Sequence, residues 1–307
     1  MVPPLRSLVI ALAALVLFAC AEQSPAPPAD GIAESRGFPL TLTDDEGAET
    51  TLDAPPERII TFAPSHTEIV FALGLGEKLV GISGPFDDYP PEAAAIEAVA
   101  GRSGVEPTLE KVVSLEPDVL LTAFIGGEWK ERLRDLDIPV FTTLATSFPD
   151  TLVDIETIGR LLGAEAEADA ILSNINADME AVGERLATID PVTCFLDLSD
   201  LFTVGPGSLE FDLLQRAGCE PITATADDPY PQWSLEQLVE DDPDVYLVGE
   251  GVPVDQVAEQ PGIRDLTAVR QGRIHEVNAL ISRPGPRIAQ GIGELAAALH
   301  GETEAAA

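Results

Sequence analysis

The chain has 307 residues, 45% of them hydrophobic, which is enough for two domains of ordinary size with substantial cores. Its 53 acidic residues outnumber its 17 basic residues and give a formal net charge of -36, which argues against nucleic-acid binding because that function needs a basic face. The acidic residues are spread along the chain and only three lysines are present, as in proteins from a proteome adapted to high salt, where charge repulsion is screened.

Residues 1–19 are typical of a secretory leader. Their apolar stretch, LVIALAALVLFA, is too short to cross a bilayer of about 30 Å as a helix. It runs into LFAC, which resembles a bacterial lipobox and implies cleavage before Cys20 and lipidation of its thiol. The alternative is a plain secretory leader with an incidental cysteine. Residues 20–37 are rich in proline and alanine, so we expect a flexible tether, and no later stretch is apolar enough to cross a membrane.

Residues 38–164 are predicted to form the first α/β lobe. Four strands, in RIITFAP, LVGIS, DVLLTAF and PVFTTLA, alternate with helices, which favours a parallel sheet. In TFAPSHTEIVFALGLG the first strand runs through a Pro-Ser turn into a helix, at the edge where open α/β sheets bind ligands. The turn carries His66, for which three roles are considered: capping the helix, contacting a ligand, or coordinating a metal within that ligand.

One segment of this lobe recurs later in the chain. Residues 109–121 (LEKVVSLEPDVLL) match residues 235–247 (LEQLVEDDPDVYL) without a gap, with seven of thirteen positions identical. Each copy predicts a helix, capped by Thr108 or Ser234, followed by a strand. The match indicates two similar lobes; the alternative is one common pattern met twice.

A long helix is predicted to join the lobes. Residues 165–189 have few helix breakers and apolar residues at helical spacing. Residues 190–302 follow as the second lobe, with strands in VTCFLDLS, DVYLVGE and RIHEVN and a closing helix in RIAQGIGELAAALHG. The expected fold is therefore α/β, with two similar lobes, central parallel sheets and one bridging helix. A helical bridge permits less hinge motion than a pair of loops.

Two cysteines fall in the second lobe. Cys194 lies near the start of a predicted strand and Cys219 follows the next helix, so the βα crossover brings them to the same end of the sheet. Outside the cytoplasm they can form a disulfide, and the alternative is two buried, unpaired thiols.

The sequence contains no convincing catalytic motif. Ser65 and His66 are neighbours on a helix and do not face one another, and no G-x-S-x-G elbow is present. The chain has only three histidines and no H-E-x-x-H or Walker A motif, so we expect no catalytic residue, resident metal or cofactor. A cell-surface hydrolase is kept as the alternative of a different class.

The few aromatic residues favour a binding function. Only sixteen residues are Phe, Trp or Tyr, and several lie in Gly- and Pro-rich loops, mostly beyond strand ends, where core aromatics are less expected. These are Phe86, Tyr89, Phe124, Trp129, Tyr230 and Trp233. Flat rings across a cleft suit a large, partly apolar ligand, although each ring alone could be a local packing anchor.

Several segments together resemble the periplasmic cobalamin-binding proteins of ABC importers. They are RIITFAPSHTEIVFALGLGEKLVGIS, DYPPEA, LEKVVSLEPDVLL, YPQWSLEQL and SRPGPRIAQGI, within residues 57–299. The resemblance implies that the two lobes are Rossmann-like and joined by the long helix, and that ligand is held between them and passed to a permease and ATPase complex. It further implies a monomer in the periplasm or at the cell surface, attached to the membrane only through its lipid anchor. Relatives in that family bind ferric siderophores or haem, which are the alternatives to a cobalt corrinoid.

The resemblance also assigns residues to the site. The family's pocket aromatics fall on Phe86, Phe124 and Tyr230, and Leu280 and Arg283 fall at the rim of the cleft. Tyr89 beside Phe86 is added to the expected ligand contacts, and so is His66, which stands where the family more often has a small or amide residue. Glu110 and Glu236, which occupy equivalent positions in the two repeats, are expected to dock into arginine-lined pockets of the permease. Helix dipoles alone would also favour a carboxylate at either position.

Overall fold

The computed structural model describes residues 37–84, 86–101, 104 and 106–301. The predicted leader, most of the tether and Cys20 lie outside the described residues. Within them, no helix is both long enough and apolar enough to cross a membrane.

The first lobe is built on a parallel sheet of four strands in the order β4-β3-β5-β6. Its strands are β3 (Ile59–Phe62), β4 (Leu79–Gly81), β5 (Val119–Thr122) and β6 (Val140–Thr142). Nearly every strand residue is buried, as expected when helices cover both faces of a parallel sheet. All four strands predicted for this lobe are confirmed.

The second lobe repeats this topology. Its parallel sheet has the order β10-β9-β7-β8, formed by β7 (Val192–Asp197), β8 (Cys219–Pro221), β9 (Val245–Val248) and β10 (Ile274–Glu276). In chain order both sheets run second, first, third, fourth, so each has a switch point between its first and third strands. The three strands predicted here are confirmed, and the short β8 was missed.

The helices of the first lobe and of the connection between the lobes are α1 (Pro64–Ala72), α2 (Leu109–Ser114), α3 (Glu128–Arg134), α4 (Phe148–Leu162) and α5 (Glu165–Leu186). Those of the second lobe are α6 (Leu209–Arg216), α7 (Leu235–Asp241), α8 (Val254–Ala258), α9 (Thr267–Arg270) and α10 (Ile288–His300). Short 3₁₀ turns lie at Gly76–Lys78, Pro91–Ala95, Ile263–Asp265 and Ala279–Ser282. The repeated segments form α2 with β5 and α7 with β9, as predicted.

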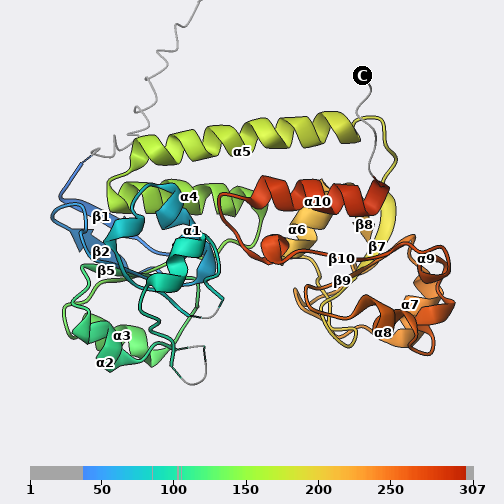
Figure 1. The fold of residues 1–307 in the computed structure, drawn as a ribbon, viewed down its shortest axis with the longest axis horizontal. Helices are drawn as coiled ribbons and strands as arrows, with labels where there is room; N and C mark the ends of the chain where they lie inside the picture. Colours follow the sequence, from blue (N-terminus) through green and yellow to red (C-terminus); the bar gives the residue numbers. More distant parts are fainter. Residues whose placement is uncertain (1–36, 85, 102–103, 105, 302–307) are drawn as a thin grey trace, which may run out of the picture. The chain divides into compact units, whose positions relative to one another are not determined.

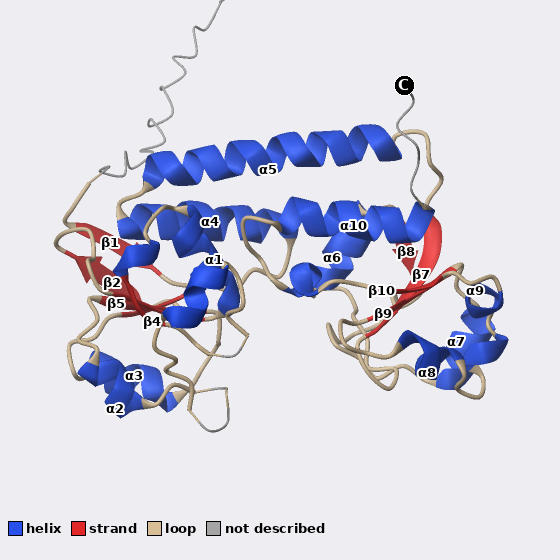
Figure 2. Ribbon diagram, viewed as in Figure 1, coloured by secondary structure: helices blue, strands red, loops and turns tan. Residues whose placement is uncertain are grey.

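The predicted bridge is the helix α5, which runs along α4 of the first lobe and α10 of the second (Figures 1 and 2). Its buried residues, Ala168, Ile175 and Val182, are seven apart and form one stripe facing these helices. A Cβ atom at Gly159 of α4 would lie only 2.5 Å from the Cβ of Ala168, so glycine lets the two helices approach closely. The bridge is therefore packed along its length.

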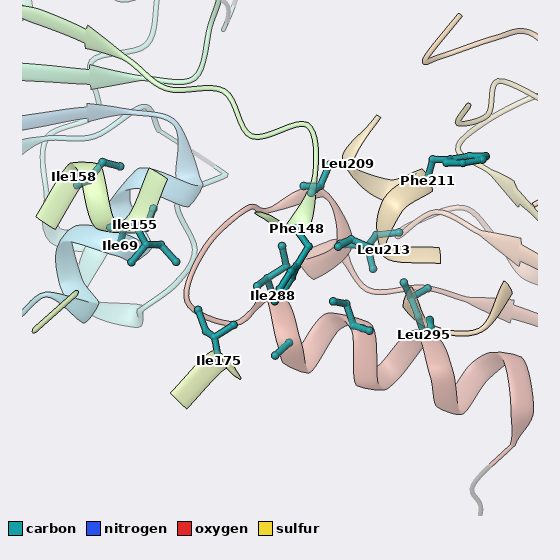
Figure 3. Close-up of a cluster of buried hydrophobic side chains, with 14 of the residues drawn as sticks. Ile69, Phe148, Ile155, Ile158, Ile175, Leu209, Phe211, Leu213, Ile288 and Leu295 are labelled. Atoms are coloured by element: carbon teal, nitrogen blue, oxygen red, sulfur yellow. The ribbon is translucent and has the colours of Figure 1, made fainter. Parts of the chain in front are cut away.

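One hydrophobic core runs through both lobes beneath α5. In Figure 3, Phe148, Ile175 and Ile288 lie between the first-lobe side chains, such as Ile155, and second-lobe side chains such as Leu213. The backbone amide of Phe148 also donates a hydrogen bond of 2.7 Å to Asp212 of α6. This shared core explains why the chain from Gly37 onward forms a single compact unit.

Two features stand outside the repeated plan. The antiparallel hairpin of β1 (Leu40–Thr43) and β2 (Glu49–Leu52) precedes the first sheet and was missed by sequence analysis. Its turn is attached to the sheet because Asp44 accepts a hydrogen bond of 3.2 Å from the amide of Thr142. In the second lobe, Cys194 of β7 and Cys219 of β8 form a disulfide, with their Cα atoms 5.9 Å apart.

Candidate ligand-binding site

Exposed apolar side chains gather on the loops that follow the carboxyl ends of the strands. Twelve large hydrophobic residues of the described chain are exposed, and seven of them lie on these loops. The seven are Phe86, Tyr89, Phe124, Ile125, Leu144, Phe202 and Tyr230. Because open α/β sheets bind ligands at this edge, and because grouped apolar surface marks interaction sites, each lobe presents one wall of a candidate site.

In the first wall, Phe124 rests on a buried aromatic support. Its ring lies 5.3 Å from that of Phe62, which in turn lies 5.8 Å from Trp129. Lys130, which is almost completely buried, holds this loop in place. Its ammonium group donates hydrogen bonds to the Phe124 carbonyl and, at 3.0 Å, to the Thr142 hydroxyl. Phe124 therefore exposes one face while its backbone is held in place.

In the second wall, Tyr230 stacks on Phe202. Their ring centroids are 6.3 Å apart and their planes differ by 23°. The Tyr230 hydroxyl donates a hydrogen bond of 3.1 Å to Glu210. Burial, together with the Glu210 carboxylate, raises the pKa of that hydroxyl, so it stays a donor. Phe202 was missed, although it meets the criterion applied to the other loops: an aromatic residue just beyond a strand end.

The remaining first-lobe aromatics, Phe86 and Tyr89, share the loop after β4. Phe86 is the most exposed large hydrophobic residue in the described part of the chain, at 73%. Arg283, predicted to contact the ligand, reaches this loop from the second lobe and places its Nη1 atom 2.6 Å from Asp88. The same atom lies 3.6 Å from Glu68 of α1, so the guanidinium is engaged by protein carboxylates.

Three aromatic or apolar predictions do not match the geometry. Trp129 and Trp233 were expected among the aromatics of the cleft loops, but both are buried and belong to the cores below the loops. Leu280, expected at the rim, is 3% exposed and packs against Gly291 of α10. Burying a leucine side chain is more favourable than leaving it at an exposed rim. The position of Leu280 in the sequence does not show which of these two environments it occupies.

His66 does not cap its helix. The N-cap residue of α1 is Ala63, and no side chain forms a cap hydrogen bond there. The imidazole is buried, with Nε2 2.9 Å from the hydroxyl of Thr143, the residue that follows β6. Burial lowers the pKa of His66 to about 4, so the ring is neutral near pH 7. The capping interpretation is therefore wrong. The buried ring instead packs inside the first lobe, where it is hydrogen-bonded to Thr143.

Glu110 and Glu236 lie where the repeat predicts them, in the first turns of α2 and α7. Both are exposed, and neither forms an ion pair with a described residue. Three positions further on, each helix exposes an identical valine: Val113 at 39% and Val239 at 48%. An i, i+3 pair shares one helix face, so each lobe presents the same Glu–Val face.

Among the described residues, no group of three or more His, Cys, Asp or Glu side chains is placed to hold a metal ion. The Ser234 side chain caps α7 as predicted, accepting a hydrogen bond from the Gln237 amide, whereas Thr108 forms no cap bond at α2.

Comparison with known proteins agrees with this geometry. The family model described as "Periplasmic binding protein" matches residues 59–279. The chain is 32% identical to "Uncharacterized ABC transporter substrate-binding lipoprotein YvrC" of Bacillus subtilis, with 95% of each chain covered. It is 31% identical to "Cobalamin-binding protein" of Halobacterium salinarum, covering 96% of this chain and 84% of the relative.

The fold resembles the crystal structure of the periplasmic vitamin B12 binding protein BtuF of Vibrio cholerae. The TM-score is 0.69 and the sequence identity 28%, with 80% of this chain and 97% of that chain covered. The family match covers more than half of the chain. It agrees with the observed fold, in which two sheets of the same strand order are joined by one long helix. The chain belongs to the periplasmic binding protein family, whose members are solute-binding, non-enzymatic components of transport systems.

Proposed function

We propose that this protein is a lipid-anchored, extracytoplasmic solute-binding protein that captures cobalamin or a related corrinoid and delivers it to an ABC permease. The observation that carries the proposal is the pair of aromatic walls on the loops beyond the carboxyl ends of the strands in the two sheets. A corrinoid is broad, partly apolar and rigid, so it matches flat rings that are held from behind. The likeness to cobalamin-binding relatives supports the same ligand class.

The ligand would lie between Phe86, Tyr89 and Phe124 on one side and Tyr230 with Phe202 on the other. Phe124 and Tyr230 are backed by Phe62 and Phe202, so they lose little side-chain entropy when a ligand covers them. His66 would support the site through its hydrogen bond to Thr143 rather than by coordinating the ligand's metal, because its side chain is only 2% exposed and a ligand on the surface does not reach it.

The ligand class is tested by calorimetry on the mature protein in high salt, with cyanocobalamin, cobinamide, haem and a ferric hydroxamate siderophore as probes. We expect binding of one equivalent of a corrinoid. A clear signal for haem or the siderophore, with none for either corrinoid, overturns the corrinoid assignment. Binding of none of the probes to folded protein overturns the proposal for this site as a whole.

Docking to the permease would use the Glu110 and Glu236 faces. A carboxylate flanked by exposed apolar surface suits an arginine-containing pocket, because the valine helps to exclude water from the charge-assisted pair. The helix dipole favours a glutamate in the first turn but gives no reason to expose a valine beside it in both lobes.

The anchor would be Cys20. We expect metabolic labelling with a radioactive or clickable fatty acid to mark the wild-type chain, and Cys20→Ala to release unlabelled protein from the membrane fraction. Labelling that survives Cys20→Ala would contradict the anchor while leaving the binding proposal intact.

A further inference from the structure

The loop that carries Phe86 and Tyr89 is held by two different lobes. Asp87 points inward: it is 4% exposed and accepts hydrogen bonds from the Thr67 and Ser83 hydroxyls and, at 2.7 Å, from the Gly84 amide. This network fixes Asp87 to α1 through Thr67 and to the start of the loop, just after β4, through Ser83 and Gly84.

The next two residues are held from the second lobe. Asp88 accepts the 2.6 Å hydrogen bond from Arg283, and the guanidinium carbon of Arg287 lies 3.6 Å from the centroid of the Tyr89 ring. Both arginines come from the SRPGPR segment that leads into α10. The segments DYPPEA and SRPGPR, nearly two hundred residues apart in sequence, therefore meet at the loop.

Glu68 of α1 holds the two arginines together. It forms a bidentate pair with Arg287, with distances of 2.9 and 2.6 Å, and lies 3.6 Å from Arg283. The Glu68 side chain is 4% exposed, so this part of the cluster is shielded from salt, whereas the Asp88 side chain is 65% exposed. Two carboxylates thus neutralise two guanidinium groups. The buried Glu68–Arg287 pair is the more strongly held, and the exposed Asp88–Arg283 pair is the more easily broken.

We propose that Arg283 and Arg287 are positioning residues for the ligand-binding loop. They set the placement of Phe86 and Tyr89 from across the lobe junction, and Arg283 acts through Asp88 rather than by touching the ligand. The proposal rests on the corrinoid-binding function proposed above and adds to it a contact that couples the aromatic loop to the second lobe. Asp88 and Glu68 already engage the Arg283 guanidinium, as expected for a residue that positions the loop.

A double-mutant cycle tests the proposal. Cyanocobalamin affinity is measured in high salt for Asp88→Asn, Arg283→Gln and the double variant. We expect each single change to weaken binding by roughly 3- to 10-fold and the double variant to be no weaker than Arg283→Gln alone, since Arg283→Gln already removes the link to Asp88.

If Arg283 contacts the ligand directly, Asp88→Asn frees it and leaves affinity unchanged or higher, while Arg283→Gln still weakens binding; that result overturns the proposal. Additive losses in the double variant overturn it as well. Arg132→Gln is the matched control, because it breaks an exposed 3.1 Å pair with Glu128 in α3 and should leave affinity unchanged.

A second measurement separates this proposal from the ligand assignment. Amide hydrogen exchange of the loop between β4 and the turn at Pro91, recorded without ligand, should accelerate in Asp88→Asn and Arg283→Gln but not in Arg132→Gln. Unchanged exchange in both variants contradicts the positioning role. Faster exchange in a protein that binds no corrinoid supports the positioning role and overturns only the ligand assignment.

Discussion

The two lobes share a topology but differ in what they carry. Their sheets have the same strand order, and α2 and α7 expose the same Glu–Val face. The cleft loops differ: five exposed hydrophobic residues lie on the first lobe and two on the second. The duplicated helix face suits a partner made of two like subunits, whereas the unequal walls suit a ligand without two-fold symmetry. Repetition therefore marks the proposed docking surface, and divergence marks the proposed cleft.

Removing both duplicated carboxylates tests most sharply whether the repeated helix face is a docking surface. We expect Glu110→Ala with Glu236→Ala to reduce ligand uptake in cells by about 30-fold or more, because two charge-assisted contacts are lost together. Each single variant should show an intermediate loss. Ligand affinity and melting temperature of the purified protein should stay as in the wild type.

Glu156→Ala on α4 is the control for this experiment, since it removes an exposed carboxylate outside both surfaces. Lost ligand affinity in the double variant would place the two glutamates in the cleft. Normal uptake would reduce them to residues that stabilise helix N-termini.

The second lobe alone has a covalent link within its sheet. Replacing Cys194 and Cys219, 25 residues apart, by alanine should lower the free energy of unfolding by about 3 kcal/mol, since the closed loop no longer restricts the unfolded chain. Denaturant unfolding of wild type and variant measures the change. Equal stability of the variant and of the wild type, measured without a reducing agent, would show that the disulfide does not stabilise the fold.

The first lobe carries a buried carboxyl group on α4 whose pKa is strongly raised. Burial, and next the Asp45 carboxylate, raise the pKa of Asp154 in α4 from 3.8 to about 7. The folded state thus keeps a proton that the unfolded state releases, so this residue costs stability increasingly as the pH rises from about 4 to 7. Asp154→Asn should stabilise the protein by roughly 2–4 kcal/mol at pH 8 and very little at pH 4.

Thermal unfolding of both proteins across this pH range checks the sign. A gain that is the same at pH 4 and pH 8 would contradict the titration. His66 acts in the opposite direction: burial lowers its pKa to about 4, so its contribution to stability is lost as the pH falls through about 6.5 towards 4.

Much of the repeated framework could be predicted from sequence, because buried parallel strands are continuous apolar runs and the repeat supplied an internal check. The strand β8 was missed because Cys-Glu-Pro is short and ends in proline. The hairpin of β1 and β2 was missed because its threonine-rich strands are half exposed. Neither omission changes where the candidate site lies.

The site was less predictable than the fold, because orientation depends on contacts between distant segments. Trp129 and Phe124 are five residues apart, yet one ring is buried and the other exposed. Arg283 looks available in the sequence, but Asp88 and Glu68 occupy it in the fold. Phe202 could have been found from its position alone, whereas the burial of His66 against Thr143 depends on tertiary packing.

The smallest expected effect concerns the exposed valines. Val113→Ser with Val239→Ser should reduce uptake by about 2- to 5-fold, as expected for residues that exclude water around a central charged contact. Ligand affinity should not change. Val153→Ser, at a similarly exposed position on α4, is the matched control. Uptake equal to that of the control would limit docking to the carboxylates.

The central claim is that a corrinoid binds between the two unequal aromatic walls. The most direct measurement is the affinity for cyanocobalamin of the wild type and of Phe124→Ala with Tyr230→Ala, one change in each wall, in high salt. We predict one bound equivalent for the wild type and an affinity about 100-fold lower for the variant, at a melting temperature within a few degrees. Equal affinities for the two folded proteins would contradict the claim, because the ligand would then bind elsewhere.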